Sequence, residues 1–263
     1  MHKSGFVNII GNPNVGKSTL MNALVGEKLS IITSKAQTTR HRIMGIVSGE
    51  DFQIVYSDTP GILKPSYKLQ ESMMKFVTGA VTDADVILYV TDTVEQGDRS
   101  AEIIGRIRES GIPTVVVINK IDLSTPEALD ALVDKWRQEL PEAQIVPASA
   151  KENFNIEGLF KTILALLPEG PAFYPKETLT DKTLRFFASE IIREKILKFY
   201  DKEIPYCCEI EIDSYREEPT IDRIAATIYV ARDSQKGILI GHKGEKLKRV
   251  GQTAREDMEE FLG

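Results

Sequence analysis

The sequence contains few of the features that mark secreted, membrane-spanning or zinc-stabilised proteins. Its two cysteines, Cys207 and Cys208, are adjacent and unsuited to a structural disulfide, which is typical of a reducing cytosol. The three histidines are scattered and form no zinc-binding pattern. No apolar run approaches the roughly 20 residues that span a bilayer, and the N-terminus lacks the apolar core of a signal peptide. We therefore expect an unsecreted, cytoplasmic protein.

The composition is that of an ordinary globular protein. The 263 residues are 42% hydrophobic and 27% charged, and this length predicts one large domain or two modest ones. The formal net charge of −6 excludes a protein that binds nucleic acid through an overall positive field. Any nucleic-acid binding must therefore use a local basic patch.

The most informative stretch is a glycine-rich loop near the N-terminus. Residues 11–18 (GNPNVGKS) match the phosphate-binding pattern G-x-x-x-x-G-K-[ST], between an apolar run at 6–10 and a helix-forming segment at 18–25. Glycines let consecutive N–H groups face one anion, and the helix dipole adds positive potential there. Lys17 would reach the β- and γ-phosphates, and the Ser18 hydroxyl would bind Mg²⁺. A surface turn is the alternative, which the flanking strand and helix disfavour.

Apolar strands alternate with helical segments downstream of this loop. We expect strands at 42–47, 52–58, 85–92, 114–118 and 144–147, and helices at about 66–81 and 98–110. This alternation predicts a doubly wound α/β sheet. Ligands of such sheets bind at the carboxyl ends of the strands.

Three polar stretches follow predicted strand ends. Asp58 begins the stretch Asp-Thr-Pro-Gly at 58–61, where a Walker-B-type acid would hold Mg²⁺ through water. Asp122 ends Asn-Lys-Ile-Asp at 119–122, and its carboxylate could accept the two hydrogen bonds that guanine offers and adenine does not. The stretch Ser-Ala-Lys at 149–151 could contact the base through its backbone. For each stretch alone, a polar strand end or helix cap is the alternative.

In this order, the stretches resemble the five G boxes of translation-factor-class GTPases. The run at 36–40 (AQTTR) and the Asp-Thr-Pro-Gly stretch narrow the resemblance to the TrmE–Era branch. The resemblance implies GTP hydrolysis with Mg²⁺, and it implies that Thr38 or Thr39 binds Mg²⁺ when GTP is present; we favour Thr39. Loss of the γ-phosphate would then release the loop at 33–42.

The resemblance implies three overlapping sets of site residues. The catalytic set is Lys17, Thr39 and Gly61, and the Mg²⁺ set is Ser18, Thr39 and Asp58. The set that contacts GTP is Gly11, Asn12, Pro13, Asn14, Val15, Gly16, Lys17, Ser18, Thr19, Thr38, Asp58, Thr59, Pro60, Gly61, Asn119, Lys120, Asp122, Ser149, Ala150 and Lys151.

One departure from related enzymes concerns hydrolysis. Ras-type enzymes carry a water-orienting glutamine directly after the glycine equivalent to Gly61, whereas this chain has Ile62. An aliphatic side chain cannot orient water by a hydrogen bond, so we expect slow intrinsic hydrolysis. Asn14 resembles the asparagine that holds K⁺ in potassium-activated relatives, which makes K⁺ a second candidate ion. A turn residue that tolerates left-handed backbone is the alternative for Asn14.

A stretch rich in proline and glycine separates a second region. We expect a linker at 169–180, between a GTPase domain at 1–168 and a smaller α+β domain at 181–263. The second domain is expected to contain an amphipathic helix at 182–199. Alternating strands follow at 207–213 and 224–230, joined by a long polar connection at 214–222.

A second glycine loop lies near the C-terminus. Gly241 and Gly244 bracket two polar residues between helical segments. The order helix, two strands, helix, loop and helix resembles a type II KH domain, whose GxxG loop clamps a single-stranded nucleic-acid backbone. A plain helix–turn–helix is the alternative for the loop alone. The residues expected to bind RNA are Lys236, Gly241, His242, Lys243, Gly244, Lys246, Lys248 and Arg249.

The end of the chain departs from that KH arrangement. A type II KH fold finishes with a third strand, which is not found before Gly263. We therefore expect a C-terminally truncated domain in which the helix face of Leu247, Val250 and Phe261 loses cover.

The two regions together resemble the KH-domain GTPases of the TrmE–Era branch over essentially the whole chain. This implies a monomeric GTP switch that binds small-subunit (16S) ribosomal RNA near its 3′ end and assists 30S assembly, with peripheral contact at the inner face of the cell membrane. Two alternatives are open. One is an RNA-binding module whose G domain only senses nucleotide. The other is a GTPase of a tRNA-modification complex, which predicts a C-terminal catalytic cysteine that this sequence lacks.

Overall fold

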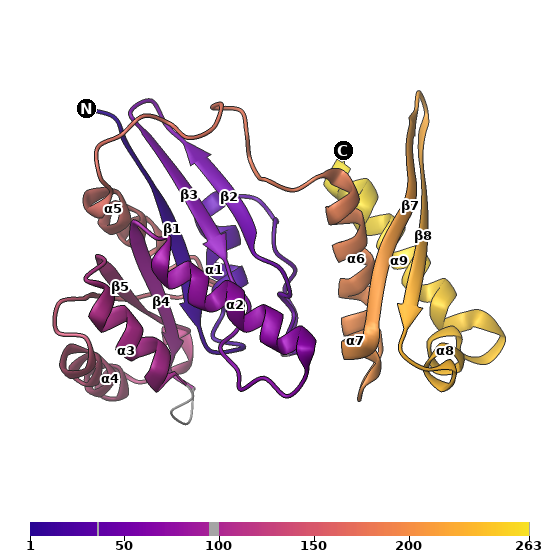
Figure 1. The fold of residues 1–263 in the computed structure, drawn as a ribbon, viewed down its shortest axis with the longest axis horizontal. Helices are drawn as coiled ribbons and strands as arrows, with labels where there is room; N and C mark the ends of the chain where they lie inside the picture. Colours follow the sequence, from indigo (N-terminus) through magenta and orange to yellow (C-terminus); the bar gives the residue numbers. More distant parts are fainter. Residues whose placement is uncertain (36, 95–99, 263) are drawn as a thin grey trace. The chain divides into compact units, whose positions relative to one another are not determined.

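The computed structural model describes residues 1–35, 37–94 and 100–262, in two compact units (Figure 1). One unit comprises Met1–Ser30 and Thr39–Asp181, and the other comprises Ile31–Thr38 and Lys182–Gly263. Ala36, the predicted helix start at 98–99 and Gly263 lie outside the described residues.

The part of the first unit that is described is built on a six-stranded sheet of order β2-β3-β1-β4-β5-β6. Neighbouring strands are parallel except β2, which runs antiparallel to β3. The strands are β1 (Lys3–Gly11), β2 (Ile43–Ser48), β3 (Phe52–Asp58), β4 (Val86–Asp92), β5 (Thr114–Asn119) and β6 (Gln144–Pro147). β4 and β5 are buried along their whole length, as continuous apolar runs in a covered parallel sheet require. The predicted doubly wound sheet is confirmed.

Helices cover both faces of this sheet (Figure 1). One face carries α1 (Lys17–Val25) and α5 (Ile156–Leu166), and the other carries α2 (Lys68–Thr82), α3 (Ala101–Ser110) and α4 (Pro126–Glu139). An aliphatic core fills the space between the sheet and α2, α3 and α4. The loops that leave the carboxyl ends of the strands are thereby held on a rigid base.

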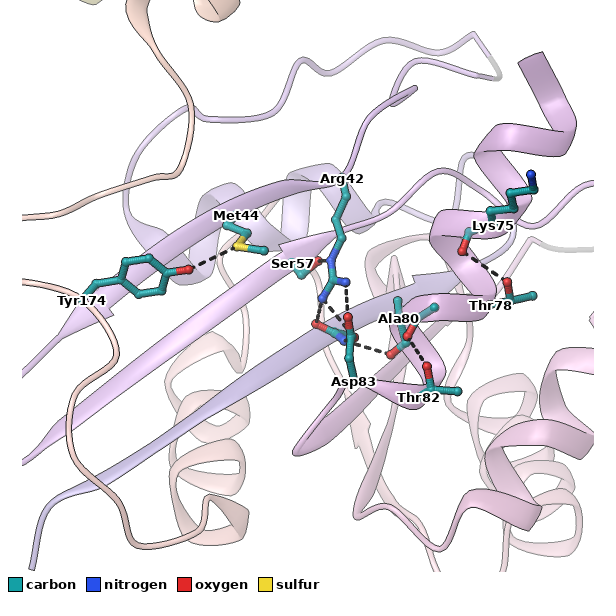
Figure 2. Close-up of polar contacts among 11 residues, drawn as sticks. Arg42, Met44, Ser57, Lys75, Thr78, Ala80, Thr82, Asp83 and Tyr174 are labelled. Atoms are coloured by element: carbon teal, nitrogen blue, oxygen red, sulfur yellow. Dashed lines mark hydrogen bonds and ion pairs between the residues drawn. The ribbon is translucent and has the colours of Figure 1, made fainter. Parts of the chain in front are cut away.

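The stretch at 169–181 follows the edge of β2 in the first unit. Thr180 pairs with Gly45, and the backbone N–H of Ile46 donates to the Leu179 carbonyl at 2.8 Å. Tyr174 rests its hydroxyl against the sulfur of Met44, as Figure 2 shows. The predicted linker residues are therefore held by backbone bonds to the sheet.

The second unit combines four helices with a β-ribbon in its described part (Figure 1). The elements are α6 (Leu184–Phe199), α7 (Ile204–Cys207), β7 (Cys208–Glu218), β8 (Ile221–Val230), α8 (Asp233–Ile240), a 3-10 turn at His242–Gly244 and α9 (Glu245–Leu262). Their core unites buried side chains of both long helices, α8 and the base of the ribbon. This is the α+β arrangement expected of a KH domain.

The predicted long connection at 214–222 is wrong. β7 continues to Glu218 and β8 begins at Ile221, so only Pro219 and Thr220 connect them. The pairing register shifts between Ile212 and Ser214, which marks a β-bulge. Beyond the bulge the ribbon is largely exposed on both faces, so polar residues form its strands and hide the alternation that sequence reasoning needs.

The predicted loss of cover over α9 is wrong for its central residue. Val250 is 1% exposed and packs in one cluster with Ile196 and Leu239. α6 and α8 therefore supply the cover at this point. Phe261, nearer the end of α9, is 37% exposed and contacts the Phe187 ring.

Candidate nucleotide site and second glycine loop

The phosphate loop connects β1 to α1 at the carboxyl edge of the sheet. Gly16 caps α1 with φ of 94°, and a Cβ there would lie 2.3 Å from the side-chain nitrogen of Asn119. Only glycine fits this backbone and this close approach. Lys17 is 6% exposed and its Nζ donates to the Asn12 carbonyl at 2.8 Å. The remaining predicted loop residues, Gly11, Pro13, Val15 and Thr19, lie in the same loop and the first turn of α1.

Three oxygen-bearing side chains converge beside this loop. Asp58 Oδ2 accepts hydrogen bonds from Ser18 Oγ at 2.7 Å and Thr39 Oγ1 at 3.3 Å, and the two hydroxyls lie 3.0 Å apart. Asp58 is fully buried, and its Oδ1 has no hydrogen-bond partner among the described residues. This trio is the predicted Mg²⁺ set, brought together from α1, the loop at 33–42 and β3.

The electrostatics of Asp58 suit a cation. Burial raises the pKa of its carboxyl, against the opposing effects of the Lys17 charge and of hydrogen bonds from Ser18, Ser30 and Thr39. A buried carboxylate with an unused oxygen beside two hydroxyls is the hard-oxygen environment that Mg²⁺ prefers. The residues present therefore fit Mg²⁺.

The two threonines of the loop at 33–42 have different surroundings. Thr38 Oγ1 donates to the Lys35 carbonyl at 2.6 Å and lies 2.7 Å from Thr33 Oγ1. Thr39, by contrast, is the threonine that reaches Ser18 and Asp58. The geometry therefore favours Thr39 over Thr38 as the metal-side residue.

A second group of predicted residues joins the phosphate loop to the end of β5. Asn119 donates to the Val15 carbonyl at 2.9 Å and accepts from the Ala150 N–H at 3.0 Å. Asp122 is exposed, and its Oδ1 accepts from Ser149 Oγ at 2.6 Å. These three hydrogen bonds link the phosphate loop, the 119–122 stretch and the 149–151 stretch. Lys151 is exposed and pairs with Glu152.

Lys120 and Asn14 lie on the rim of the same site. The Lys120 ammonium pairs with Asp92 Oδ2 at 2.6 Å and donates to the Asn14 carbonyl. Asn14 is exposed and adopts φ of 65°, the left-handed backbone that asparagine tolerates. The turn role predicted as the alternative for Asn14 is therefore present.

The 58–61 stretch divides its residues between the site and the core. Thr59 is fully buried and its hydroxyl donates to the Ile9 carbonyl at 2.7 Å, so its side chain points away from the phosphate loop. Pro60 is also buried, and the N–H of Ile62 donates to the Gly11 carbonyl at 3.1 Å. The Ile62 side chain is 3% exposed in the core that α2 covers.

Sequence reasoning missed three residues that support the site. Ser30 hydrogen-bonds Asp58, and the Asn22 amide holds the Leu29–Ser30 backbone through three bonds. Asp92 fixes Lys120. None of them lies in a recognisable motif. Asp92 alone carried a signal, because it ends a buried strand at the edge where ligands bind.

The second glycine loop lies between α8 and α9. Gly241 and Gly244 have φ of 75° and 77°, and His242 and Lys243 between them are exposed. Ile238 and Ile240, on the preceding helix, are 45% and 37% exposed. An exposed backbone turn beside an apolar surface and the basic first turns of α9 suits a single-stranded nucleic-acid chain.

The predicted basic residues do not all share one face. Lys246 Nζ lies 5.6 Å from the Tyr200 ring centre, and the Arg249 guanidinium lies 4.3 Å from that of Phe199. Lys248 is exposed two residues before buried Val250, and so lies on the opposite side of α9. Lys236 is exposed on α8. The structure therefore groups Lys246 and Arg249 and separates Lys248 from them.

No helix among the described residues is long and apolar enough to cross a membrane.

Comparison with known protein families finds two matches, one in each half of the chain. Residues 6–120 match the family described as 50S ribosome-binding GTPase. Residues 203–263 match the KH domain family.

Individual relatives match over the full chain. GTPase Era of Staphylococcus haemolyticus (strain JCSC1435) is 44% identical over 264 residues, covering 100% of this chain and 88% of the relative. GTPase Era of Alkaliphilus metalliredigens (strain QYMF) is also 44% identical, covering 100% of this chain and 90% of the relative.

Two solved structures are similar throughout. One is a crystal structure of Era in complex with MgGDPNP and nucleotides 1506–1542 of 16S ribosomal RNA. It superposes with a TM-score of 0.95 at 40% identity, covering 100% of this chain and 90% of that one. The other is an Aquifex aeolicus Era variant bound to GDP.AlF4-, with a TM-score of 0.94 at 40% identity over 99% of this chain and 90% of that one.

Proposed function

This chain belongs to the Era family of GTPases, and we propose that it is a GTP-hydrolysing switch that binds 16S ribosomal RNA near its 3′ end and assists assembly of the 30S subunit. Membership of a GTPase family confirms the predicted enzyme class and argues against a G domain that only senses nucleotide. The RNA assignment is supported by the relative whose crystal structure contains that RNA segment. The domains we assign are a GTPase domain at 1–168, a linker at 169–180 and a KH domain at 181–263.

The observation that carries the nucleotide assignment is the convergence of four motifs at one sheet edge. In this proposal Lys17 exchanges the Asn12 carbonyl for the β- and γ-phosphates, and the N–H groups of the phosphate loop bind the same phosphates. Ser18, Thr39 and Asp58 would hold Mg²⁺, the last through water. When bound, Mg²⁺ neutralises charge that develops on the phosphates.

Asp122 selects the base in this proposal. Its Oδ1 already accepts from Ser149, and the carboxylate is exposed toward solvent, so it can accept both N–H groups of guanine's edge. Asn119, Lys120 and the 149–151 backbone position the carboxylate and contact the base. Adenine lacks that pair of donors and would leave the carboxylate unpaired.

The test exchanges this carboxylate for an amide. Asp122→Asn should weaken GTP binding by about 100-fold or more, because two charge-assisted bonds are lost. The amide can donate to the 2-oxo group of xanthine, so affinity for xanthosine triphosphate should rise. Asp130→Asn, on exposed α4, is the matched control and should change neither affinity. Equal uptake of ATP and GTP by the unaltered protein would overturn the assignment.

We propose K⁺ as a second ion, near Asn14. The support is the asparagine itself, together with the buried Ile62 where a water-orienting glutamine would otherwise lie. GTP turnover should therefore be faster in KCl than in NaCl at equal ionic strength, and Asn14→Ala should abolish the difference. Equal rates in the two salts would dispose of the K⁺ role.

We propose that RNA binds at the loop from Gly241 to Gly244, with Lys246 and Arg249 contributing more than Lys248. The double substitution His242→Asp with Lys243→Asp should abolish binding of a segment equivalent to nucleotides 1506–1542, because it places two negative charges where phosphates approach. Lys248→Asp adds a like charge on the opposite side of α9 and should weaken binding far less.

The cellular assignment needs its own experiment. Crosslinking the protein to RNA in cells, followed by sequencing, should enrich the 3′ end of small-subunit RNA. Enrichment of another RNA would overturn the proposed function while leaving the GTPase assignment intact.

We propose a cytoplasmic monomer with peripheral contact at the inner membrane face. Co-flotation with vesicles of cytoplasmic-leaflet lipids tests that contact.

A further inference from the structure

Arg42 ties together four segments of the first unit without belonging to any of the motifs above. It lies at the carboxyl end of the loop at 33–42, and its side chain is 16% exposed. Its Nε donates to Ser57 Oγ at 2.5 Å, and its Nη2 donates to Asn8 Oδ1 at 3.0 Å. Both terminal nitrogens also contact the Asp83 carboxylate, as Figure 2 shows.

The groups that receive this guanidinium are themselves fixed. Asn8 and Ser57 are fully buried on neighbouring strands. The Asn8 amide nitrogen donates to the Ala80 carbonyl at 2.8 Å and to Asp83 Oδ1 at 2.6 Å, so the amide is satisfied on both sides. A planar guanidinium with several partners in a fixed fork holds one geometry, which a single ammonium cannot reproduce.

Each partner leads directly to a part of the nucleotide site. Asn8 lies on β1, three residues before the phosphate loop begins at Gly11. Ser57 immediately precedes Asp58. Asp83 caps the end of α2, the helix that follows the 58–61 stretch. Arg42 itself comes three residues after Thr39.

We infer that Arg42 is a positioning residue for GTP hydrolysis: it fixes the carboxyl end of the loop at 33–42 so that Thr39 is presented to Ser18 and Asp58. This inference rests on the role proposed above for Thr39. When Thr39 binds at the Mg²⁺ site, a loop that is anchored at its carboxyl end loses less conformational entropy than a loop that is free at that end. The GDP state releases Thr39, so Arg42 contributes to the affinity for GTP and not to that for GDP.

The test compares Arg42→Lys with Arg106→Lys, an exposed arginine on α3 paired with Glu102. We expect Arg42→Lys to lower kcat for GTP by about tenfold, with little change in KM, because Thr39 is misplaced at the reacting phosphate. The ratio of affinities for a non-hydrolysable GTP analogue and GDP should fall by a similar factor, while GDP affinity stays within about twofold of the unaltered protein. Arg106→Lys should change none of these quantities.

Two milder variants keep the test decisive if Arg42→Lys does not fold. Ser57→Ala and Asp83→Asn each remove or weaken one partner of the Arg42 guanidinium. Each should lower kcat and the affinity ratio, but by a smaller factor than Arg42→Lys does. The double variant Arg42→Lys/Asp83→Asn should be no worse than Arg42→Lys alone, because both changes break one network.

Two results would overturn the inference. One is a lower melting temperature with kcat and the affinity ratio unchanged, which indicates that Arg42 stabilises the fold without positioning Thr39. The other is an equal loss of GTP and GDP affinity. Thr39→Ala separates this failure from that of the proposed function. If Thr39→Ala lowers the ratio and the Arg42 network variants do not, only the inference fails; if Thr39→Ala leaves the ratio unchanged, the role proposed for Thr39 fails.

Discussion

Asp58 is a buried carboxyl whose charge opposes folding in the metal-free protein. Its carboxyl is fully buried, with Oδ1 lacking a partner among the described residues, and burial raises its pKa above the ordinary value for aspartate. The folded state therefore holds a proton more tightly than the unfolded state. Stability from this group is present below the ordinary aspartate pKa and is lost as pH rises through the raised pKa. In its ionised form the buried carboxylate destabilises the fold until a cation binds it.

Asp58→Asn should accordingly stabilise the nucleotide-free, metal-free protein while abolishing Mg²⁺-dependent GTP binding. The amide has the same shape without the buried charge, and a gain of about 1 kcal/mol would raise the melting temperature by ~2–4 °C. Thermal melts in EDTA check the stability, and separate melts in EDTA-free buffer with and without MgGTP check the binding. Asp92→Asn is the comparison, since that carboxylate is paired with Lys120 and its loss should destabilise. A lower melting temperature for Asp58→Asn in EDTA would contradict the argument.

At the scale of elements, the connection from β3 to α2 places Ile62 in the core beside a backbone bond to the phosphate loop. The carbonyl of Gly11 accepts a hydrogen bond from the Ile62 N–H, which holds the backbone of this connection against the start of the phosphate loop. The side chain, however, faces Ile10 and Val77. The packing is consistent with the slow hydrolysis expected from the sequence, because the Ile62 side chain lies in the hydrophobic core and not in the nucleotide site.

Ile62→Gln should therefore fail to create a water-orienting glutamine. Removing an aliphatic side chain from a full core and burying an amide without partners should destabilise the protein by about 2–5 kcal/mol. Turnover of GTP per folded molecule should not rise. Urea unfolding and single-turnover hydrolysis measure the two quantities. Ile62→Val, which keeps the apolar packing, should lose only about 0.5–1.5 kcal/mol. Faster hydrolysis by Ile62→Gln would show that the side chain can reach the site.

The elements also show where sequence reasoning succeeds and where it fails. β4 and β5 were predictable because strands buried on both faces are continuous apolar runs. The outer half of the β7–β8 ribbon was not, because its stability comes from cross-strand polar pairs such as Arg223 with Glu218. In the site, motif residues were predictable from spacing. Supporting residues such as Arg42 were not, because their partners lie far away in the sequence.

At the scale of the whole molecule, each unit has a hydrophobic core of its own. The first unit packs α1 and α5 on one sheet face and α2, α3 and α4 on the other, with Ile163 of α5 fully buried. The second unit packs α6, α8, α9 and the ribbon around Ile196, which is also fully buried. The second unit is small, and small domains bury a lower fraction of their surface and are marginally stable. The same Ile→Ala substitution in the core of each unit should therefore impair the activity of that unit and spare the activity of the other.

Ile196→Ala should remove about 2–5 kcal/mol from the second unit, abolish binding of the 16S segment and leave GTP turnover near that of the unaltered protein. Ile163→Ala makes the same chemical change in the first unit and should reverse the pattern, with GTP binding weakened and RNA binding retained. Hydrogen exchange resolved by peptide locates the lost protection, which should stay within the substituted unit. If either variant lowered protection and activity in both units equally, the chain would unfold as one cooperative body. The second unit would then depend on the first unit for its fold.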